Sequence, residues 1–308
     1  MEHPQRKALF RFLVWIGAAS IAAALAAPNF LTLLSQAVDD AFGTVLPAIP
    51  FAALLTILLL LRWKDIAEVL SKEGGVRTEV PTRLLGLGIV VSFVLARGFT
   101  GLSVYSSAVA VVLVFYGMAL ALNPLTKRIT FPYAMIYSVG VAAPAVLQWA
   151  FGEPLAALSS ALSQIFLSVG GIPLVWYGTQ FQLVSKTGEV VAATVTPGCS
   201  SIVSVTTFIG LLALMHIDLK KDLPSTIKVA VAGVVALTLL NAAGITILVW
   251  VGYIDGAAAL WNVHNWVGYT LFLGFYLVTL AIYPRMGRPS GLRGHPFGGT
   301  TWEPTTVQ

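Results

Sequence analysis

The sequence predicts an all-α fold: a polytopic transmembrane helix bundle of about eight spans, with a small β-hairpin-like extracytoplasmic loop. Three observations support this fold class. The 308 residues are 57% hydrophobic and only 10% charged, whereas soluble domains carry about 25% charged residues. The apolar residues come in runs of roughly 20, the length that a helix needs to cross a bilayer. The basic residues gather in alternate connections between these runs, as they do in cytoplasmic loops.

The expected spans follow from the apolar runs and their polar or Pro/Gly boundaries. In chain order they are Leu9–Ala27, Thr44–Leu61, Leu84–Gly101, Leu102–Leu122, Pro132–Ala150, Cys199–His216, Thr226–Val251 and His264–Tyr283. The third and fourth are separated only by Arg97–Gly101. No soluble domain and no repeat of 20–50 residues is apparent. We therefore expect one transmembrane domain, 1–284, with an extracytoplasmic insert at 151–198 and a disordered cytoplasmic tail at 285–308, which is rich in Gly, Pro and Thr.

The basic residues also predict the orientation. With the N-terminus in the cytoplasm, all of the 18 Lys and Arg residues except Arg97 and Lys186 fall on the cytoplasmic side. The positive-inside rule then predicts a multi-pass protein of the cell (plasma) membrane with both termini cytoplasmic. The net charge of +5 has the same origin, since basic loops are held at anionic lipid. The expected partner is therefore the lipid bilayer, and nucleic-acid binding is not expected.

The insert between Phe151 and Gly198 is expected to hold a helix followed by short strands. In Leu155–Leu167 leucines recur at helical spacing, which is typical of an amphipathic helix that lies along the membrane surface or packs on the bundle. Short β-branched runs separated by Gly-containing turns follow as far as Val195. These runs predict two or three small strands, which end just before the sixth span.

Cys199 is the candidate nucleophile. It is the one cysteine of the chain, so the chain has no intrachain disulfide and no multi-cysteine metal site. It stands where a helix is expected to begin on the outer face, and the positive helix end favours a thiolate there. The alternative is a small buried hydrophobic residue, which is the role of most free cysteines in membrane helices.

His264 is the candidate base and proton shuttle, because it opens the eighth span on the same face as Cys199. Pairing a thiol with an imidazole is a standard route to an activated nucleophile. The alternative is an interfacial polar residue beside the tryptophans of an aromatic belt. The other histidines are expected at the cytoplasmic side or in the termini, out of reach of the outer site: His3, His216 and His295.

Several segments resemble the exosortase/archaeosortase family of multi-spanning cysteine transpeptidases. They are Gly171-Ile-Pro-Leu-Val, a strand pair, Pro197-Gly-Cys199-Ser200, Leu240-Asn241-Ala-Ala-Gly244-Ile245 and His264-Asn-Trp-Val-Gly268-Tyr-Thr-Leu-Phe272. The resemblance covers roughly Leu155 to Tyr283. It implies a site of cysteine, arginine and histidine (or a second arginine) at the outer membrane face, with Cys199 as the nucleophile and His264 as the histidine. It implies no metal and no organic cofactor.

The resemblance also implies the substrates. They are exported proteins with a C-terminal motif, a transmembrane helix and a basic cluster, which are cut near that signal. The new carboxyl end is then transferred to an amine or lipid acceptor.

One departure from the family pattern concerns the arginine, which normally follows the asparagine by three positions. That position is Gly244 here, and Ser201 replaces the glycine that commonly follows Cys-Ser. A shifted alignment does not restore the arginine, because the seventh span contains none. Two explanations stay open. Arg97 supplies the charge from the third span, although it could equally snorkel to the interface; or the protein has lost activity and only binds.

The expected function is that of an exosortase-like membrane thiol protease or transpeptidase that processes C-terminal sorting signals. The Cys199 thiolate attacks a peptide carbonyl and His264 protonates the departing amine, after which water or an amine resolves the thioester. Asn241 and Ser200 are expected to donate hydrogen bonds to the oxyanion or to support the site. The loop from Gly171 to Val195 is expected to dock the substrate along an exposed strand edge.

Two other classes of function remain as alternatives. The first is a catalytically inactive exosortase-like protein that recognises a membrane-anchored partner without cutting it. The second is a small-solute transporter, which is disfavoured because the expected spans contain almost no charge and the polar residues gather at one surface.

Overall fold

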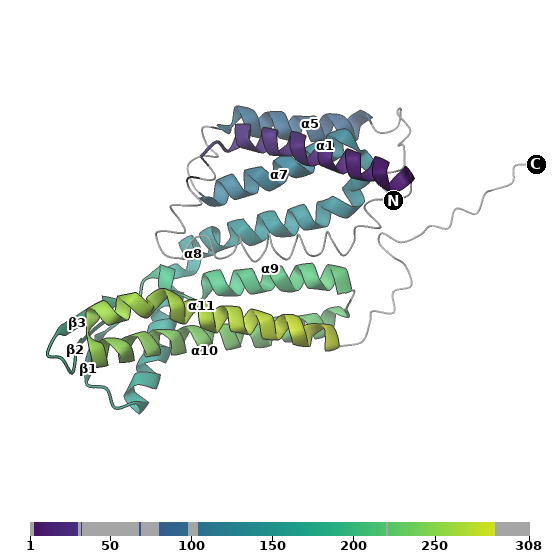
Figure 1. Cartoon of the computed structure of the whole chain (residues 1–308). Helices are drawn as coiled ribbons and strands as arrows, with labels where there is room; N and C mark the ends of the chain where they lie inside the picture. Colours follow the sequence, from purple (N-terminus) through teal and green to yellow (C-terminus); the bar gives the residue numbers. More distant parts are fainter. Residues whose placement is uncertain are drawn as a thin grey trace, which may run out of the picture.

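A computed structural model describes residues 3–29, 32, 68, 80–97, 104–219 and 221–286. Helices dominate this part of the chain and lie side by side in a bundle, with a small sheet at one end (Figure 1). The helices are α1 (His3–Ala26), α5 (Val80–Leu95), α7 (Val104–Leu122), α8 (Lys127–Val169), α9 (Ile202–Leu219), α10 (Leu223–Asp255) and α11 (Ala257–Ile282). α1, α5 and α7 lie on one side of α8, and α9, α10 and α11 lie on the other. The predicted fold class, a helical membrane bundle with a small β-sheet, is confirmed.

Five of the described helices are long and apolar enough to cross a membrane. The apolar segments are Leu9–Ala26, Thr130–Val169, Ile202–Leu219, Leu223–Asp255 and Trp266–Arg285, and two shorter apolar helices are Val80–Leu95 and Ser106–Leu122. Each expected span within the described residues therefore overlaps a helix, and the third and fourth are separate helices. The expected second span, Thr44–Leu61, lies outside the described residues, as does the expected tail beyond Met286.

The close packing of α5 on α7 depends on two glycines that face each other. A Cβ atom on Gly86 would lie 2.5 Å from the carbonyl oxygen of Gly117, and one on Gly117 would lie 2.8 Å from that of Gly86. Helices in membranes approach closely where small residues meet, because dispersion contacts between backbones then stabilise the pair. The two facing glycines therefore allow α5 and α7 to pack tightly against each other.

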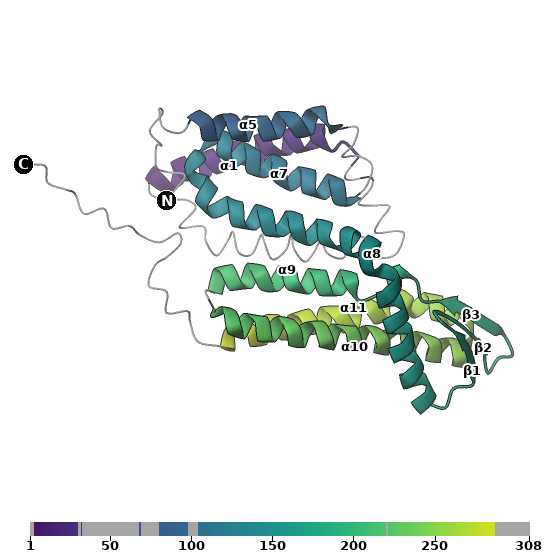
Figure 2. The same ribbon diagram turned by 180° about the vertical axis from the view of Figure 1, so that it is seen from behind.

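α8 joins the fifth expected span and the amphipathic stretch into one helix of 43 residues. Figure 2 shows that the second part of α8 turns sharply and crosses α10 beside the sheet. Pro154 stands inside the helix at the junction of the two stretches. A proline there removes a backbone hydrogen bond and clashes with the preceding turn, which bends the axis.

The buried face of this second part of α8 consists mostly of small residues. The stretch packs on the bundle, which is one of the two placements expected for it, and its Leu158 side chain is 45% exposed. The small face allows close approach to α10, where the Ser163 hydroxyl donates to the carbonyl of Ala242 at 3.1 Å. The residues buried on this face are Ala156, Ser159, Ser160, Ser163 and Leu167.

The predicted small strands form a three-stranded antiparallel sheet in the order β1 (Leu174–Tyr177), β2 (Gln180–Val184) and β3 (Val190–Thr194). Its buried face carries Phe181, Leu183 and Val191, which cluster with Val249 of α10 and Leu260 of α11. The alternation of buried and exposed side chains along β2 gives the sheet this apolar face. The sheet is therefore fixed on the junction between α10 and α11.

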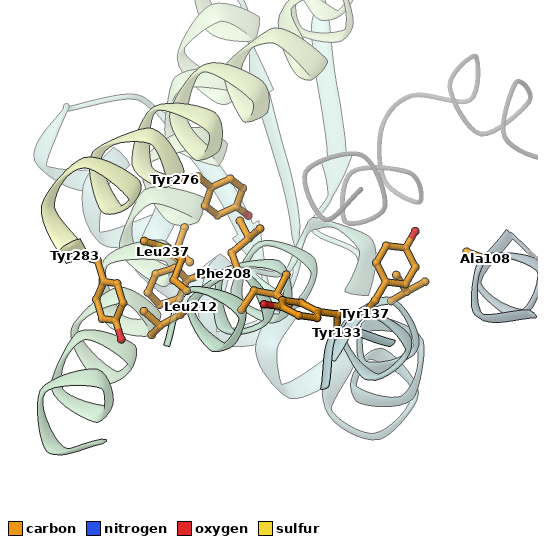
Figure 3. Packing of buried hydrophobic residues seen from close by; sticks show 12 residues of the cluster. Ala108, Tyr133, Tyr137, Phe208, Leu212, Leu237, Tyr276 and Tyr283 are labelled. Atoms are coloured by element: carbon orange, nitrogen blue, oxygen red, sulfur yellow. The ribbon is translucent and has the colours of Figure 1, made fainter. Parts of the chain in front are cut away.

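An aromatic cluster holds α8 to α11 together around α9 (Figure 3). The ring of Phe208 is fully buried at its centre, and a Cβ atom on Gly233 of α10 would overlap that ring. Farther along, the Tyr276 hydroxyl of α11 donates to the carbonyl of Ser204 at 3.0 Å. These contacts fix α9, the helix that follows Cys199, between its neighbours. The labelled residues are Ala108, Tyr133, Tyr137, Phe208, Leu212, Leu237, Tyr276 and Tyr283.

Candidate functional site

Cys199 ends a short 3-10 turn, Pro197–Cys199, between β3 and α9. The expected span that starts at Cys199 is therefore corrected, since α9 begins three residues later at Ile202. The turn is closed by the Cys199 amide, which donates to the carbonyl of Thr196 at 2.8 Å. It packs against α8, where a Cβ atom on Gly152 would lie 2.8 Å from the Cβ of Pro197. The position of the thiol is thus set by β3 on one side and α8 on the other.

Asn241 of α10 holds this turn in place. Its side-chain amide donates to the Cys199 carbonyl at 2.8 Å and to the Ser159 hydroxyl of α8 at 3.1 Å. Its side chain is only 8% exposed, and buried amides of this kind are costly to leave without partners. One residue therefore ties α8, α10 and the turn together.

The geometry assigns Asn241 and Ser200 a supporting place rather than the expected place at an oxyanion. Both amide hydrogens of Asn241 have partners within the protein. The Ser200 hydroxyl donates to the carbonyl of Pro197 at 2.7 Å. Neither side chain has a donor left for a group in the cavity, because each donor already stabilises the turn.

His264 lies two turns inside α11, because that helix begins at Ala257 rather than at the histidine as expected. Cys199 and His264 line the same cavity, so the two predicted residues lie together. The imidazole also stacks in a tilted arrangement on the Trp261 ring, with 5.6 Å between ring centroids.

The surroundings of Cys199 favour its charged form. Burial raises the pKa of the thiol, but side-chain hydrogen bonds with His264 and Thr196, the backbone of Thr196 and the positive charge of His264 act in the opposite direction, and the net pKa is lowered. The Thr196 hydroxyl lies 3.5 Å from the Cys199 sulfur. A thiol with a lowered pKa is a better nucleophile at neutral pH because more of it is thiolate.

The cavity around this pair has a volume of about 200 Å³ and lies between β3, the 3-10 turn, α9, α10 and α11. Its walls are mostly apolar, and Cys199, His264 and Thr194 supply polar groups. Leu271 and Phe272 extend the lining along α11 toward Tyr276. The shape suits an apolar group held beside a reactive thiol.

Gly244, where the resemblance implies an arginine, lines the same cavity one turn after Asn241. A Cβ atom there would lie 3.4 Å from Leu271, in ordinary van der Waals contact. Arg97 is exposed two residues after the end of α5, a helix that packs on α1 and α7, and it is not among the residues that line the cavity. Among the described residues that line the cavity, none is Lys or Arg.

A contact that the sequence did not suggest anchors α11, the helix that carries His264. The Glu189 carboxylate, in the turn between β2 and β3, accepts a hydrogen bond from the Ala257 amide at 3.1 Å. A carboxylate at a helix N-terminus satisfies an orphan amide and interacts favourably with the helix dipole. Gly256 precedes that amide with φ +88°, and a Cβ atom there would overlap the carboxylate.

The same turn is fixed to the end of α10. The Lys186 amide donates to the Tyr253 carbonyl at 2.7 Å, and its ammonium group lies 5.5 Å from the centre of the Tyr253 ring. Glu189 and Thr196 went unnoticed in the sequence because each is an ordinary polar residue near a turn. The position of Thr196 three residues before Cys199 is a signal that could have found it.

Within the described part of the chain, no group of three or more His, Cys, Asp or Glu side chains is arranged to hold a metal ion. The family model of the transmembrane exosortases matches residues 39–281, which is well over half of the 308 residues. The match includes Cys199, Asn241, Gly244 and His264. No curated protein and no solved structure matches the chain.

Proposed function

The chain belongs to the transmembrane exosortase family, and we propose that it is a membrane thiol protease or transpeptidase that processes the C-terminal sorting signals of exported proteins. One observation carries the proposal. Cys199 and His264 line one cavity, and the pKa of the thiol, which burial alone would raise, is lowered by hydrogen bonds and by the charge of His264. A nucleophile beside a proton carrier, in a mostly apolar cavity, is the arrangement that acyl transfer requires.

The proposed reaction has two steps. The Cys199 thiolate attacks the carbonyl carbon of the scissile peptide, and His264 gives its proton to the departing amine. The C–N bond breaks and a thioester forms. Water or an amine then attacks the thioester carbonyl, His264 takes a proton from that nucleophile, and the thiolate leaves.

The oxyanion that forms in each step needs hydrogen-bond donors. The first amides of α9 have no carbonyl partner within the helix, and this helix starts directly after the turn that bears Cys199. Val203 and Ser204 of its first turn line the cavity. We therefore assign oxyanion stabilisation to the N-terminal amides of α9 rather than to Asn241 or Ser200.

The proposed site faces the outside of the cell. α10 begins and α11 ends at the end of the bundle opposite the sheet (Figure 1). In the sequence, Lys221 precedes the start of α10 and Arg285 follows the end of α11. Basic residues favour the cytoplasmic side, which supports cytoplasmic termini and an extracytoplasmic Cys199. A membrane-impermeant maleimide should label Cys199 in intact cells and spare Lys221→Cys in a Cys199→Ala background. The reverse labelling would contradict this orientation.

A second candidate function is recognition without cleavage. It is favoured by Gly244, because the described lining of the cavity carries no guanidinium, whereas the family resemblance implies one at that position. Losing one stabilising group of this kind can cost on the order of 10²–10³ in rate. The same substrates would then bind to the cavity and leave uncut.

Processing of a membrane-anchored reporter tests both candidates. The reporter carries the C-terminal motif, transmembrane helix and basic cluster of an exported protein from the same cell. Cys199→Ala and His264→Ala should each leave the reporter uncut, and Ser168→Ala, exposed near the end of α8, is the matched control. Cleavage that persists in Cys199→Ala would exclude the thiol enzyme. Binding without cleavage by the wild-type chain would establish the second candidate.

A further inference from the structure

Among the described residues β3 is an edge strand of the sheet, and its hydrogen-bonding pattern shows which backbone groups face away from β2. The Val195 amide donates to the Thr179 carbonyl, and the Ser185 amide donates to the Glu189 carbonyl, both at 2.8 Å. In an antiparallel pair, hydrogen-bonded and non-hydrogen-bonded positions alternate. The register pairs Ala192 with Gln182 and Thr194 with Gln180. Ala192 and Thr194 therefore occupy the non-hydrogen-bonded positions, and their amides and carbonyls point away from β2.

This edge opens on the cavity that holds Cys199. Thr194 lines the cavity, and so do Trp261 and His264 of α11. Ala192 and Thr194 are both exposed. The strand continues from Thr194 to Cys199 in five residues, so the edge leads directly to the thiol.

We propose that the β3 edge binds the recognition motif of the substrate as a fourth, extended strand and so delivers its carbonyl to Cys199. This inference rests on the proposed function. Each Ala192 and Thr194 amide and carbonyl then pairs with the peptide, as in other cases of β-strand addition. Alternate side chains of an extended peptide point to opposite faces. The peptide side chain that faces the cavity then meets the apolar lining that includes Leu271 and Phe272. The motif should therefore carry an apolar residue at that position.

The occupant of the edge is a peptide rather than a lipid chain, and the backbone groups give the reason. A lipid tail that covered Ala192 and Thr194 would leave their amides and carbonyls without hydrogen bonds, which is unfavourable in an apolar environment. A peptide backbone supplies one partner for each of them. The outward groups of an edge strand are a template for pairing with another extended chain.

Thr194→Pro tests the proposal. Proline removes the outward amide of Thr194 but no hydrogen bond between β2 and β3, and edge positions tolerate proline. Thr194→Val is the matched variant, because it changes the side chain and keeps the amide. The KM for the membrane-anchored reporter should be about fivefold higher in Thr194→Pro than in Thr194→Val, with similar kcat, since one hydrogen bond worth about 1 kcal/mol net is lost. The pH dependence of Cys199 alkylation by iodoacetamide should be the same in both variants as in the wild-type chain, which would show that the thiol site is intact.

A photoreactive amino acid in place of Ala192 provides a second, independent readout. In a Cys199→Ala background, where the reporter is held uncut, it should crosslink to the reporter within the segment before the membrane helix. Equal KM values in Thr194→Pro and Thr194→Val, or crosslinks to lipid alone, would overturn the edge proposal and leave the thiol chemistry standing. If Thr194→Pro does not fold, the crosslink decides. Cleavage by Cys199→Ala would instead remove the proposed function itself.

Discussion

Asn241→Ala should destabilise the protein and loosen the turn that bears Cys199. The change deletes two hydrogen bonds, of 2.8 Å to the Cys199 carbonyl and 3.1 Å to the Ser159 hydroxyl. Each bond contributes about 1 kcal/mol net, and a buried group left without its partner adds to the loss. The free energy of unfolding should therefore fall by roughly 2–3 kcal/mol.

Thermal unfolding of the purified protein in detergent, followed by tryptophan fluorescence, measures this loss. For a chain of this size about 2–4 °C of Tm corresponds to 1 kcal/mol, so Tm should fall by roughly 5 °C or more. Thr246→Ala is the matched control on α10, since its hydroxyl bonds only within its own helix, to the carbonyl of Ala242. Ser159→Ala combined with Asn241→Ala should cost less than the sum of the two single changes. An unchanged Tm in Asn241→Ala, with strictly additive costs in the double variant, would refute this account of the turn.

Three further predictions concern the thiol and the helix that faces it. His264→Ala should move the iodoacetamide reactivity of Cys199 to higher pH, because burial, which raises the thiol pKa, is then opposed by Thr196 alone; an unchanged profile would show that the imidazole does not act on the thiol. Gly244→Arg should move the same profile to lower pH by roughly one unit or more, since a nearby positive charge favours the thiolate, and Gly244→Ala is its control. Glu189→Ala should lower Tm by roughly 2–4 °C through the loss of about 1 kcal/mol of helix capping, with Glu189→Gln in between; equal Tm values in all three chains would contradict the cap.

The fold class and the apolar helices within the described residues were predictable because a bilayer imposes simple rules on sequence. Runs of about 20 apolar residues mark spanning helices, and strands with short Gly-containing turns are recognisable by their β-branched residues. The ends of the helices were less predictable. The starts of α9 at Ile202 and of α11 at Ala257 depend on a 3-10 turn and on the Glu189 cap, which are contacts between segments far apart in the sequence.

The helical spacing of the leucines does not reveal which face of the amphipathic stretch is buried, for a reason specific to membranes. In water the leucines of Leu155–Leu167 would be expected to face the core. Here small residues face α10, because close backbone approach and hydrogen bonds such as that of Ser163 hold helices together. Leucines lose nothing by facing lipid, so helical spacing alone does not identify the inner face.

The proximity of Cys199 and His264 was predicted from chemistry rather than from spacing. Two reactive residue types on one face suggested a pair, and both line the same cavity. The residues that support the site were predicted in part, but their contacts were not. Asn241 was singled out, but its hydrogen-bond partners lie on α8 and in the turn, and no sequence pattern links these three segments.

The cavity draws its described lining from residues 181–276 only, and this has a consequence for how such a chain can diversify. Substitutions in α1, α5 and α7 reach the thiol only indirectly, through the packing of α7 on α8 and of α8 on α9 and α10. These three helices are therefore free to adapt to different lipids or neighbours while the chemistry at the cavity is left intact. Exchange of those three helices between related chains should accordingly alter where or with whom the protein works before it alters what it does.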